Sequence, residues 1–397
     1  MVLRQRDFRL LFCGQAVSLF GDRMVNVALA FAVLELGHSA SEVGLVFACR
    51  TLPLVLCLLA GGVVADRASR RGVMVTADLV RLVSQGALAA LLIGGGAEVW
   101  SIALLAAVTG GATGFFTPAS TGLLPEVVAP DDLQPANGLR ATAAAVGEIG
   151  GPITAGLLVA SAGAGWALAI DAATFALSAA FLARLHVPAR PPRARTTFLA
   201  DLVAGWGEFR ARRWVWTVVG SVAVTNMLWG AWTALGPVVA DRELGGAVAW
   251  GTVLAVMGAG SLAGGLVAVR IRPRRPLVVF TLGGMTFAIP LALLAAGAHT
   301  GLLAAGAFAA GVALMLGNAV WEATLQRHIP ADALSRVSAY DWFGSLAFYP
   351  LGLAVWAPVA DATGVGPALW GACILQVAVM LGLLAVPEVR RLGLRPA

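Results

Sequence analysis

The chain has 397 residues, of which 59% are hydrophobic and only 12% are charged, and its mean hydropathy is +0.85. Soluble domains carry about 25% charged residues, so this composition excludes a soluble fold and indicates a membrane protein. All 27 residues counted as lysine or arginine are arginines. The absence of lysine removes P-loop, Schiff-base and kinase-type lysine chemistry, so we do not expect ATP-driven pumping by this chain alone.

The formal charge of +6 does not indicate a nucleic-acid partner, because the arginines lie between apolar stretches and form no contiguous tract. The cysteines Cys13, Cys49, Cys57 and Cys373 fall in apolar segments without a CxxC pair, and the four histidines are scattered. The sequence therefore predicts no cofactor and no metal site. The basic start runs directly into an apolar segment without a small-residue cleavage site, so no cleaved signal peptide is expected.

Apolar runs of about 20 residues, the length that crosses a bilayer as a helix, predict an all-α membrane protein with twelve transmembrane helices. The first six spans are expected at residues 10–34, 43–64, 73–93, 100–122, 138–161 and 163–186. The second six are expected at residues 214–239, 247–269, 277–297, 300–321, 337–360 and 365–386. The span at 100–122 has the weakest signal, because Gly110, Gly111 and Gly114 dilute its apolar run.

Arginine placement predicts the orientation, since cytoplasmic flanks hold the excess of positive charge. With the N-terminus inside, the internal segments carry nearly all of the loop arginines, and Arg242 is the only arginine of the acidic external loops. We therefore expect a multi-pass protein of the plasma (inner) membrane with both termini in the cytoplasm.

A stretch at residues 187–213 is rich in proline and arginine, which resist compact packing, and we interpret it as a cytoplasmic linker. It separates an N-terminal six-helix bundle at residues 1–186 from a C-terminal six-helix bundle at residues 214–387. Residues 388–397 are then a cytoplasmic tail.

Two internal repeats support this division into halves. The segment at residues 61–67 recurs at 264–270, and the segment at 124–133 recurs at 325–334. Because the two offsets are nearly equal, the halves are expected to be duplicated six-helix units, as in transporters built from parallel repeats.

The segment after the second span reads G-V-V-A-D-R-A-S-R-R at residues 62–71. It resembles the loop between helices two and three of the major facilitator superfamily, G-x-x-x-D-R-x-G-R-R, with Ser69 at the usual glycine. We expect Gly62 to allow close helix approach and Asp66 to accept hydrogen bonds at a helix end. The arginines expected to anchor at lipid headgroups are Arg67, Arg70 and Arg71.

The resemblance implies that Asp66 belongs to a cytoplasmic latch between the two halves, and the alternative is a positive-inside anchor only. Further stretches are similar to the branch of this superfamily that contains the enterobactin exporter and the macrolide efflux proteins. They lie at residues 7–9, 21–23, 50–53, 135–138, 170–175 and 325–330.

In the fifth span, Gly151, Pro152 and Gly156 belong to a shortened form of the superfamily's antiporter motif. Its physical content is a proline–glycine kink that lets two helices pack closely. The resemblance implies export by antiport rather than uptake.

Three ionisable residues are expected deep inside the spans, where a charge is costly and indicates function. At a rise of 1.5 Å per residue, Asp22, Arg50 and Glu148 lie roughly 18, 21 and 15 Å from the cytoplasmic side. Asp22 and Arg50 are thus expected to pair across consecutive helices.

A carboxylate that carries a proton must release it near neutral pH, and nearby arginines favour the ionised form. Asp22 has Arg23 beside it, whereas Glu148 has no cationic neighbour in the sequence. We therefore expect Glu148 to carry the proton and the Asp22–Arg50 pair to act as a gate or lock. The alternatives are a static ion pair, and a Glu148 carboxyl bonded permanently to a neighbouring helix.

Other acids within the spans have a more structural interpretation. Asp171 is expected to be structural, and Asp78 with Arg81 is expected to form an i,i+3 pair. Asp341, near the inner end of the eleventh span, is expected either to cap or to gate.

In this superfamily the first and fourth helices of each half line the central cavity, so the resemblance implies substrate contacts from the first and seventh spans. The inner end of the tenth span is expected to line a vestibule. The expected cavity residues are Asn26, Asn226, Trp229, Trp232, Asn318, Trp321 and Glu322.

The expected function is proton-coupled export, by antiport and alternating access, of small amphiphilic organic molecules such as drugs, antibiotics or siderophores. The expected partners are the small organic substrate, protons and the lipid bilayer, with the chain functional as a monomer. The alternatives are a proton-coupled uptake symporter and a non-transporting membrane sensor or scaffold. An enzyme is not expected, because no nucleophile–base or metal constellation occurs in the sequence.

Overall fold

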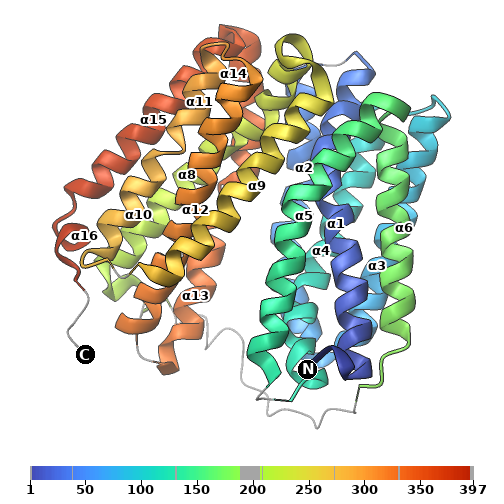
Figure 1. Ribbon diagram of the computed structural model, residues 1–397, viewed down its shortest axis with the longest axis horizontal. Coiled ribbons are helices and arrows are strands. Elements are labelled where there is room, and N and C mark those ends of the chain that lie inside the picture. The colour runs from blue at the N-terminus through green and yellow to red at the C-terminus, as the bar shows by residue number, and fades with distance from the viewer. Residues whose placement is uncertain are drawn as a thin grey trace. The chain divides into compact units, whose positions relative to one another are not determined.

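A computed structural model describes residues 2–37, 39–129, 132–187, 206–207, 209–271, 273–329 and 331–393. Their secondary structure is helical throughout, and no strand occurs among them (Figure 1). They contain 12 helical segments that are long and apolar enough to cross a membrane. Each segment overlaps one predicted span, so the prediction of an all-α, twelve-span membrane protein is confirmed. Most of the expected linker, at residues 188–205 and 208, lies outside the described residues.

The chain clusters into two compact units, which are described separately here. The first contains Met1–Arg190 and Gly236–Ala255, and the second contains Pro191–Leu235 and Val256–Ala397. The stretch Gly236–Ala255 thus groups with the first unit, although it lies in the predicted C-terminal half. The division into six-helix halves at the linker stays a prediction.

The first unit contains a short 3-10 turn, η1 (Val2–Arg4), and six long helices. They are α1 (Arg6–Glu35), α2 (Ala40–Arg67), α3 (Arg70–Ile93), α4 (Val99–Val127), α5 (Leu133–Ala162) and α6 (Ala164–Ala183). Because their connections are short, successive helices run in opposite directions. Helices α1, α3 and α5 therefore begin, and α2, α4 and α6 end, at one common end of the unit, which we call the basal end (Figure 1).

The packing within this unit does not follow chain order. Helix α2 packs mainly on α4, α1 packs mainly on α5 and α6, and α3 packs on α4 and α6. Helix α1 touches its sequence neighbour α2 only marginally. Apolar side chains from α1, α3, α4 and α6 form a buried cluster at the basal end, including Phe8, Met74, Leu123 and Leu182. The ionisable residues of α1, α3 and α6 are thereby held on helices that pack around one another.

The remaining helices follow in chain order, and the parts of them outside Gly236–Ala255 lie in the second unit. They are α8 (Arg213–Val239), the π-helix η3 (Ala240–Leu244), α9 (Gly246–Arg270), α10 (Pro276–Met285), α11 (Ala288–Ala295), α12 (Thr300–His328), α13 (Ala331–Leu346), α14 (Tyr349–Thr363), α15 (Val365–Ala385) and α16 (Pro387–Arg391). Two of the predicted spans are each divided into two helices, α10 with α11 and α13 with α14. Pro290 and Pro350 lie in the first turns of α11 and α14. Proline has no N–H for the preceding turn, which explains a break at these positions.

Glycines allow α2 and α4 to meet backbone to backbone. A Cβ atom at Gly110 would collide with the carbonyl oxygen of Arg50, and one at Gly114 would lie 2.6 Å from the carbonyl oxygen of Leu54. Two of the three glycines that weaken the apolar pattern of the fourth span, Gly110 and Gly114, therefore serve its packing. In the second unit, Cβ atoms at Gly264 and Gly311 would likewise collide with the backbone of α12 and α9, respectively. Close backbone contacts at glycines thus occur in both units.

Gly110→Ala is expected to destabilise the protein by about 1–3 kcal/mol, the usual range for overpacking a tight interface. The matched control is Gly111→Ala, because a Cβ atom at Gly111 meets Cys57 and Pro53 at an ordinary distance of 3.7 Å. Both substitutions change helix propensity by the same amount, so the difference in stability between the two variants reports the contact of residue 110 with Arg50. Thermal unfolding of the detergent-solubilised protein measures it. Equal Tm values for the two variants would contradict the packing at Gly110.

Candidate functional site

Arg81 of α3 lies in the interior of the first unit with 1% of its surface exposed. Its guanidinium carbon lies 4.3 Å from the ring centroid of Phe116 and 4.2 Å from that of Phe175, so the cation is stacked between two aromatic rings. It forms an ion pair with Asp78 one turn earlier on α3. Nη1 of Arg81 also lies 3.4 Å from Oδ2 of Asp22 on α1. The predicted i,i+3 pair of Asp78 and Arg81 is thus present, and it forms part of a larger cluster.

The expected pairing of Asp22 with Arg50 is not formed. Arg50 donates from Nη1 to Oδ1 of Asn26 at 3.2 Å, and Asp22 pairs with Arg81 instead. Residue counting gave similar depths for Asp22 and Arg50, but depth does not give the direction in which a side chain points. The Arg50 side chain does reach α1, but it meets Asn26, one turn beyond Asp22.

Asp171 of α6 is fully buried beside this cluster. Its Oδ2 accepts a hydrogen bond from Nε2 of Gln85 at 3.0 Å, and its Oδ1 has no hydrogen-bond partner among the described residues. A Cβ atom at Gly21 would collide with this oxygen, so the carboxyl lies directly against the backbone of α1 beside Asp22. Asp22, Arg50 and Arg81 are the charges that act on it electrostatically.

Around Arg81 the carboxyl groups outnumber the guanidinium groups. The carboxyl groups are those of Asp22, Asp78 and Asp171, and the nearby guanidinium groups are those of Arg81 and Arg50. Asp78 and Asp171 are fully buried, whereas 23% of the Asp22 side chain is exposed. We call these five residues the buried charge cluster, and Asp22 is its most accessible carboxyl group.

Glu148 of α5 forms an ion pair with Arg23 of α1, with Oε1 and Nη2 separated by 2.8 Å. The sequence gives Glu148 no cationic neighbour, and the structure corrects this view. Arg23 follows Asp22 in the chain, but its head group reaches α5. Of the Arg23 and Glu148 side chains, 36% and 39% are exposed, so the pair is only partly buried.

The glycines of the antiporter-like segment allow these helices to approach. A Cβ atom at Gly151 would lie 2.6 Å from Cβ of Arg23, and one at Gly156 would lie 2.6 Å from the carbonyl oxygen of Ala247. Both contacts lie within the first unit. Helix α5 continues through Pro152 to Ala162, so the motif serves close packing at both positions.

The loop motif at residues 62–71 joins α2 to α3. Its glycine at position 62 does not mediate the expected close approach, because a Cβ atom at Gly62 would meet nothing within 4 Å. The neighbouring Gly61 does so instead, since a Cβ atom there would lie 2.6 Å from the carbonyl oxygen of Gly114. One residue along a helix turns the side chain by about 100°, which moves the contact to the adjacent glycine.

Ser69 caps α3, because its hydroxyl oxygen accepts a hydrogen bond from the backbone N–H of Gly72 at 3.2 Å. Its φ of −63° requires no glycine. Arg70 donates to the carbonyl oxygen of Gly122 and to Glu126 on α4. Arg71 donates to the carbonyl oxygens of Leu182 and Ala183 at the end of α6. These two arginines therefore join helix ends, and the side chains of Asp66 and Arg67 lie outside the described set.

Ser69→Ala is expected to lower the free energy of unfolding by about 1 kcal/mol, because it removes an N-cap side chain. Ser69→Gly is expected to cost only a few tenths of a kcal/mol, since glycine is tolerated at the N-cap. Thermal unfolding of the two variants beside the unsubstituted protein measures the difference. A larger loss for glycine than for alanine would refute the capping role.

The expected cavity residues of the second unit have varied surroundings. Asn226 donates from Nδ2 to the carbonyl oxygen of Ser345 at 2.8 Å. Trp229 stacks on Phe287 with ring centroids 4.4 Å apart. Trp232 is only 1% exposed, so protein encloses it and it lines no open cavity in this conformation.

Of the residues expected to line a vestibule at the end of α12, one is buried and two are exposed. Trp321 is buried and donates from Nε1 to Oδ2 of Asp341 at 2.9 Å. Asn318 and Glu322, on the same helix, are exposed. Asp341 is therefore anchored to α12.

Sequence reasoning missed the central position of Arg81, although a signal was present. Arg81 lies 11 residues beyond Arg70, where α3 begins, which places it roughly 16 Å from the basal end. Asp171 lies 12 residues before the end of α6 and is thus at nearly the same depth. Arg140 was also missed, and its Nη2 donates to Oγ of Ser120 at 3.2 Å. Within the described chain, no group of three or more His, Cys, Asp or Glu side chains is arranged to hold a metal ion.

A chain with twelve apolar helical segments and ion pairs inside them has the architecture of a multi-pass membrane transporter. Comparison with known proteins agrees, since the family model of the Major Facilitator Superfamily matches residues 11–347. The chain belongs to the Major Facilitator Superfamily.

Its relatives include several efflux proteins. It is 28% identical to the multidrug efflux pump Tap of Mycolicibacterium fortuitum, over 94% of each chain. It is 23% identical to macrolide efflux protein A of Streptococcus pyogenes, over 98% of each chain. It is 26% identical to the enterobactin exporter EntS of Escherichia coli, over 97% of this chain and 93% of that protein. The chain is therefore a superfamily transporter with efflux-pump relatives, as its sequence predicts.

Solved structures show the same fold. The nucleoside transporter NupG aligns with a TM-score of 0.74 at 14% identity, over 95% of this chain and 98% of NupG. A POT family transporter in complex with 5-aminolevulinic acid aligns with a TM-score of 0.77 at 10% identity, over 98% of this chain and 97% of that one. At these identities the likeness concerns the fold alone.

Proposed function

We propose that this chain is a proton-coupled exporter of small amphiphilic organic molecules such as drugs, antibiotics or siderophores. The efflux relatives support export, and the charged side chains inside the spans of the first unit support coupling to protons. The transporter works as a monomer in the plasma (inner) membrane with both termini in the cytoplasm. Residues 1–186 and 214–387 are the two halves that alternate between inward-open and outward-open states.

The observation that carries the proposal is the unequal number of acids and bases in the buried charge cluster. With all groups ionised, Asp22, Asp78 and Asp171 exceed Arg81 and Arg50 by one negative charge. An uncompensated charge in the apolar interior is costly, so one bound proton neutralises the cluster. Asp22 is the most accessible of the three carboxyl groups, so it is the side from which the cluster is reached.

The Arg23–Glu148 pair is the second coupling element. Its two side chains are partly exposed, so a substrate and a proton can reach the pair alternately. Protonation of Glu148 removes the negative partner of Arg23, which weakens the link between α5 and α1. The pair therefore connects proton binding to the packing of two helices at the glycine contacts around Gly151.

Substrate binding in this proposal uses aromatic and amide groups. Asn26 on α1 and Asn226 and Trp229 on α8 supply polar and stacking contacts from the spans that line the cavity in related proteins. Trp229 presents an apolar ring, and the amides orient polar substituents. This combination suits amphiphilic organic molecules better than sugars or simple ions.

Expression in a host that lacks its major efflux pumps tests the function. Cells expressing the chain are expected to retain less of at least one compound in a panel of dyes and antibiotics. Collapse of the proton gradient with an ionophore is expected to restore retention to that of cells with an empty vector. Reduced retention that persists without the gradient would refute proton coupling, and increased retention in expressing cells would refute export in favour of uptake.

A further inference from the structure

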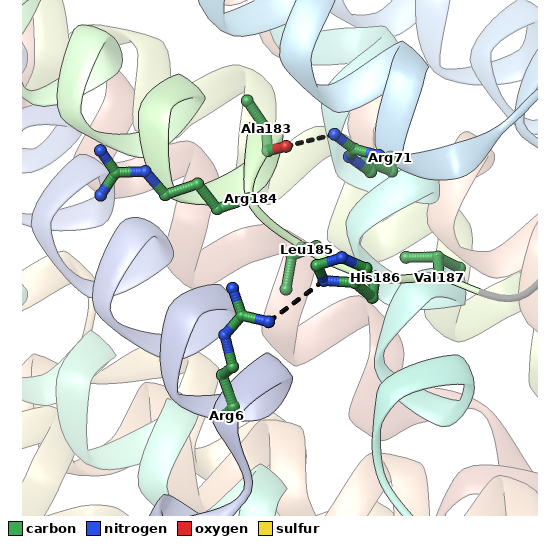
Figure 2. Close-up of a pocket in the computed structure, with 7 residues that line it drawn as sticks. All are labelled: Arg6, Arg71, Ala183, Arg184, Leu185, His186 and Val187. Atoms are coloured by element: carbon green, nitrogen blue, oxygen red, sulfur yellow. Dashed lines mark hydrogen bonds between the residues drawn. The ribbon is translucent and has the colours of Figure 1, made fainter.

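A basic cavity lies at the basal end of the first unit, where three helices meet. Its volume is about 550 Å³, and its polar lining consists of Arg6, Arg71, Arg184 and His186 (Figure 2). Arg6 begins α1, Arg71 lies in the first turn of α3, and Arg184 directly follows α6. None of the described residues that line this space is acidic. We call it the basal cavity.

The arginines of the basal cavity have no carboxylate partner within the described chain. Arg71 is fixed by its hydrogen bonds to the carbonyl oxygens of Leu182 and Ala183 (Figure 2). Nη1 of Arg6 lies 3.3 Å from Nδ1 of His186, and the Arg184 side chain points away from both. Asp7 accepts a hydrogen bond from the backbone N–H of His186 at 3.2 Å. Arg6, Arg71 and Arg184 thus all line the space, with the Arg184 head group turned away from the other two.

The cavity lies at the boundary of the membrane-spanning segments. The apolar spans of α1 and α3 begin at Arg6 and Arg70, and that of α6 ends at Ala183. This boundary is where the headgroups of a bilayer lie. An anion in the cavity would therefore be at headgroup level.

An exposed apolar stripe on α6 leads to the cavity. Trp166, Ile170 and Leu177 are 51%, 42% and 44% exposed, at helical spacings of four and seven residues. Arg184 lies 18 residues beyond Trp166, which is five turns at 3.6 residues per turn. It therefore continues the same face. A ligand that has a long apolar tail and an anionic head matches this stripe and the arginine at its end.

We propose that the basal cavity binds the phosphate headgroup of an anionic phospholipid, whose acyl chain lies along the exposed face of α6. Arginine is suited to phosphate because its planar guanidinium group donates two parallel hydrogen bonds to the oxygens. Arginines beside a membrane span also attract anionic headgroups. A free phosphate ion shares the headgroup chemistry but makes no use of the apolar stripe, so the stripe favours the lipid.

The double variant Arg6→Gln with Arg184→Gln tests this proposal. Both side chains are exposed, so the substitution does not disturb the interior, and Arg71 is retained because it holds the end of α6. The control variant, Arg390→Gln with Arg391→Gln, removes the same charge from exposed positions of α16. Native mass spectrometry measures lipid retained by each purified protein from mixed phosphatidylglycerol and phosphatidylcholine micelles.

The unsubstituted protein and the control are expected to retain phosphatidylglycerol preferentially. The affinity of the double variant for phosphatidylglycerol is expected to be at least about tenfold lower. Each arginine near a bilayer contributes about 1 kcal/mol to the binding of an anionic lipid, and 1.4 kcal/mol corresponds to about a tenfold change in affinity. Equal retention by the double variant and the control would overturn the proposal. Displacement of the lipid by glycerol 3-phosphate or inorganic phosphate at matched phosphate concentration would also overturn it, because the site would then take a free anion.

Discussion

Replacement of Arg81 by glutamine is expected to cost the protein about 3–5 kcal/mol, the usual penalty for removing one partner of a buried ion pair. Asp78, which is fully buried, would lose its contacting cation, and the stacking between Phe116 and Phe175 would be lost as well. The expected result is a large fall in Tm and in the yield of monodisperse protein. Fluorescence-detected size-exclusion chromatography after heating measures both.

Two further variants show whether charge causes this loss. Arg213→Gln breaks an exposed pair with Glu388, in which the charged atoms lie 3.8 Å apart, and is expected to change stability by less than about 1 kcal/mol. The double variant Arg81→Met with Asp78→Asn removes both buried charges and is expected to regain most of the stability. Because one positive and one negative charge are removed together, Asp22 and Asp171 still exceed Arg50 by one negative charge, and proton-coupled export is expected to persist. Unchanged stability of Arg81→Gln would contradict the buried pair.

Glu148→Gln is expected to abolish proton-driven export while leaving the fold intact. The side chain is half-exposed and its ion pair with Arg23 is partly solvated, so the cost to stability is small. The glutamine carbonyl oxygen still accepts a hydrogen bond from Arg23, but it cannot bind and release a proton. Retention of an exported dye in the efflux-deficient host is expected to match that of cells with an empty vector.

Glu388→Gln is the matched control for Glu148→Gln, because Glu388 also pairs with an arginine but follows the last membrane-spanning helix. Its export is expected to equal that of the unsubstituted protein. If Glu148→Gln exports with full dependence on the proton gradient, Glu148 is a structural partner of Arg23. Proton coupling then rests on the buried charge cluster alone.

The residue pairs within one helix were predictable from the sequence, and those between helices were not. Asp78 and Arg81 are three residues apart, so the helical repeat alone brings them together. The pairs Asp22–Arg81 and Arg23–Glu148 join helices whose contacts depend on the order in which the bundle packs. Depth along a helix follows from counting residues, but the direction of a side chain around the helix axis does not become known until its neighbours are known.

The glycines illustrate the same limit at the scale of one residue. The motif predicted a close helix contact at Gly62, and the structure forms it at the neighbouring Gly61 instead. Ser69 seemed a departure from the family motif, and it proved to cap α3. A motif thus located the turn, whereas the backbone geometry determined which residue performs each task.

The sequence by itself determined the membrane environment, the twelve spans and the superfamily, because these depend on hydropathy, length and local motifs that act within one segment. The absence of lysine argued against ATP as the energy source, and the placement of the arginines predicted the orientation in the membrane. Both arguments likewise rest on the sequence alone. Only the tertiary structure decided which acids meet which arginines, that Asp171 joins a cluster with excess negative charge, and that three helix ends form a basic cavity. These features arise from contacts between helices distant in the chain, and no local sequence pattern encodes the rotation of one helix against another.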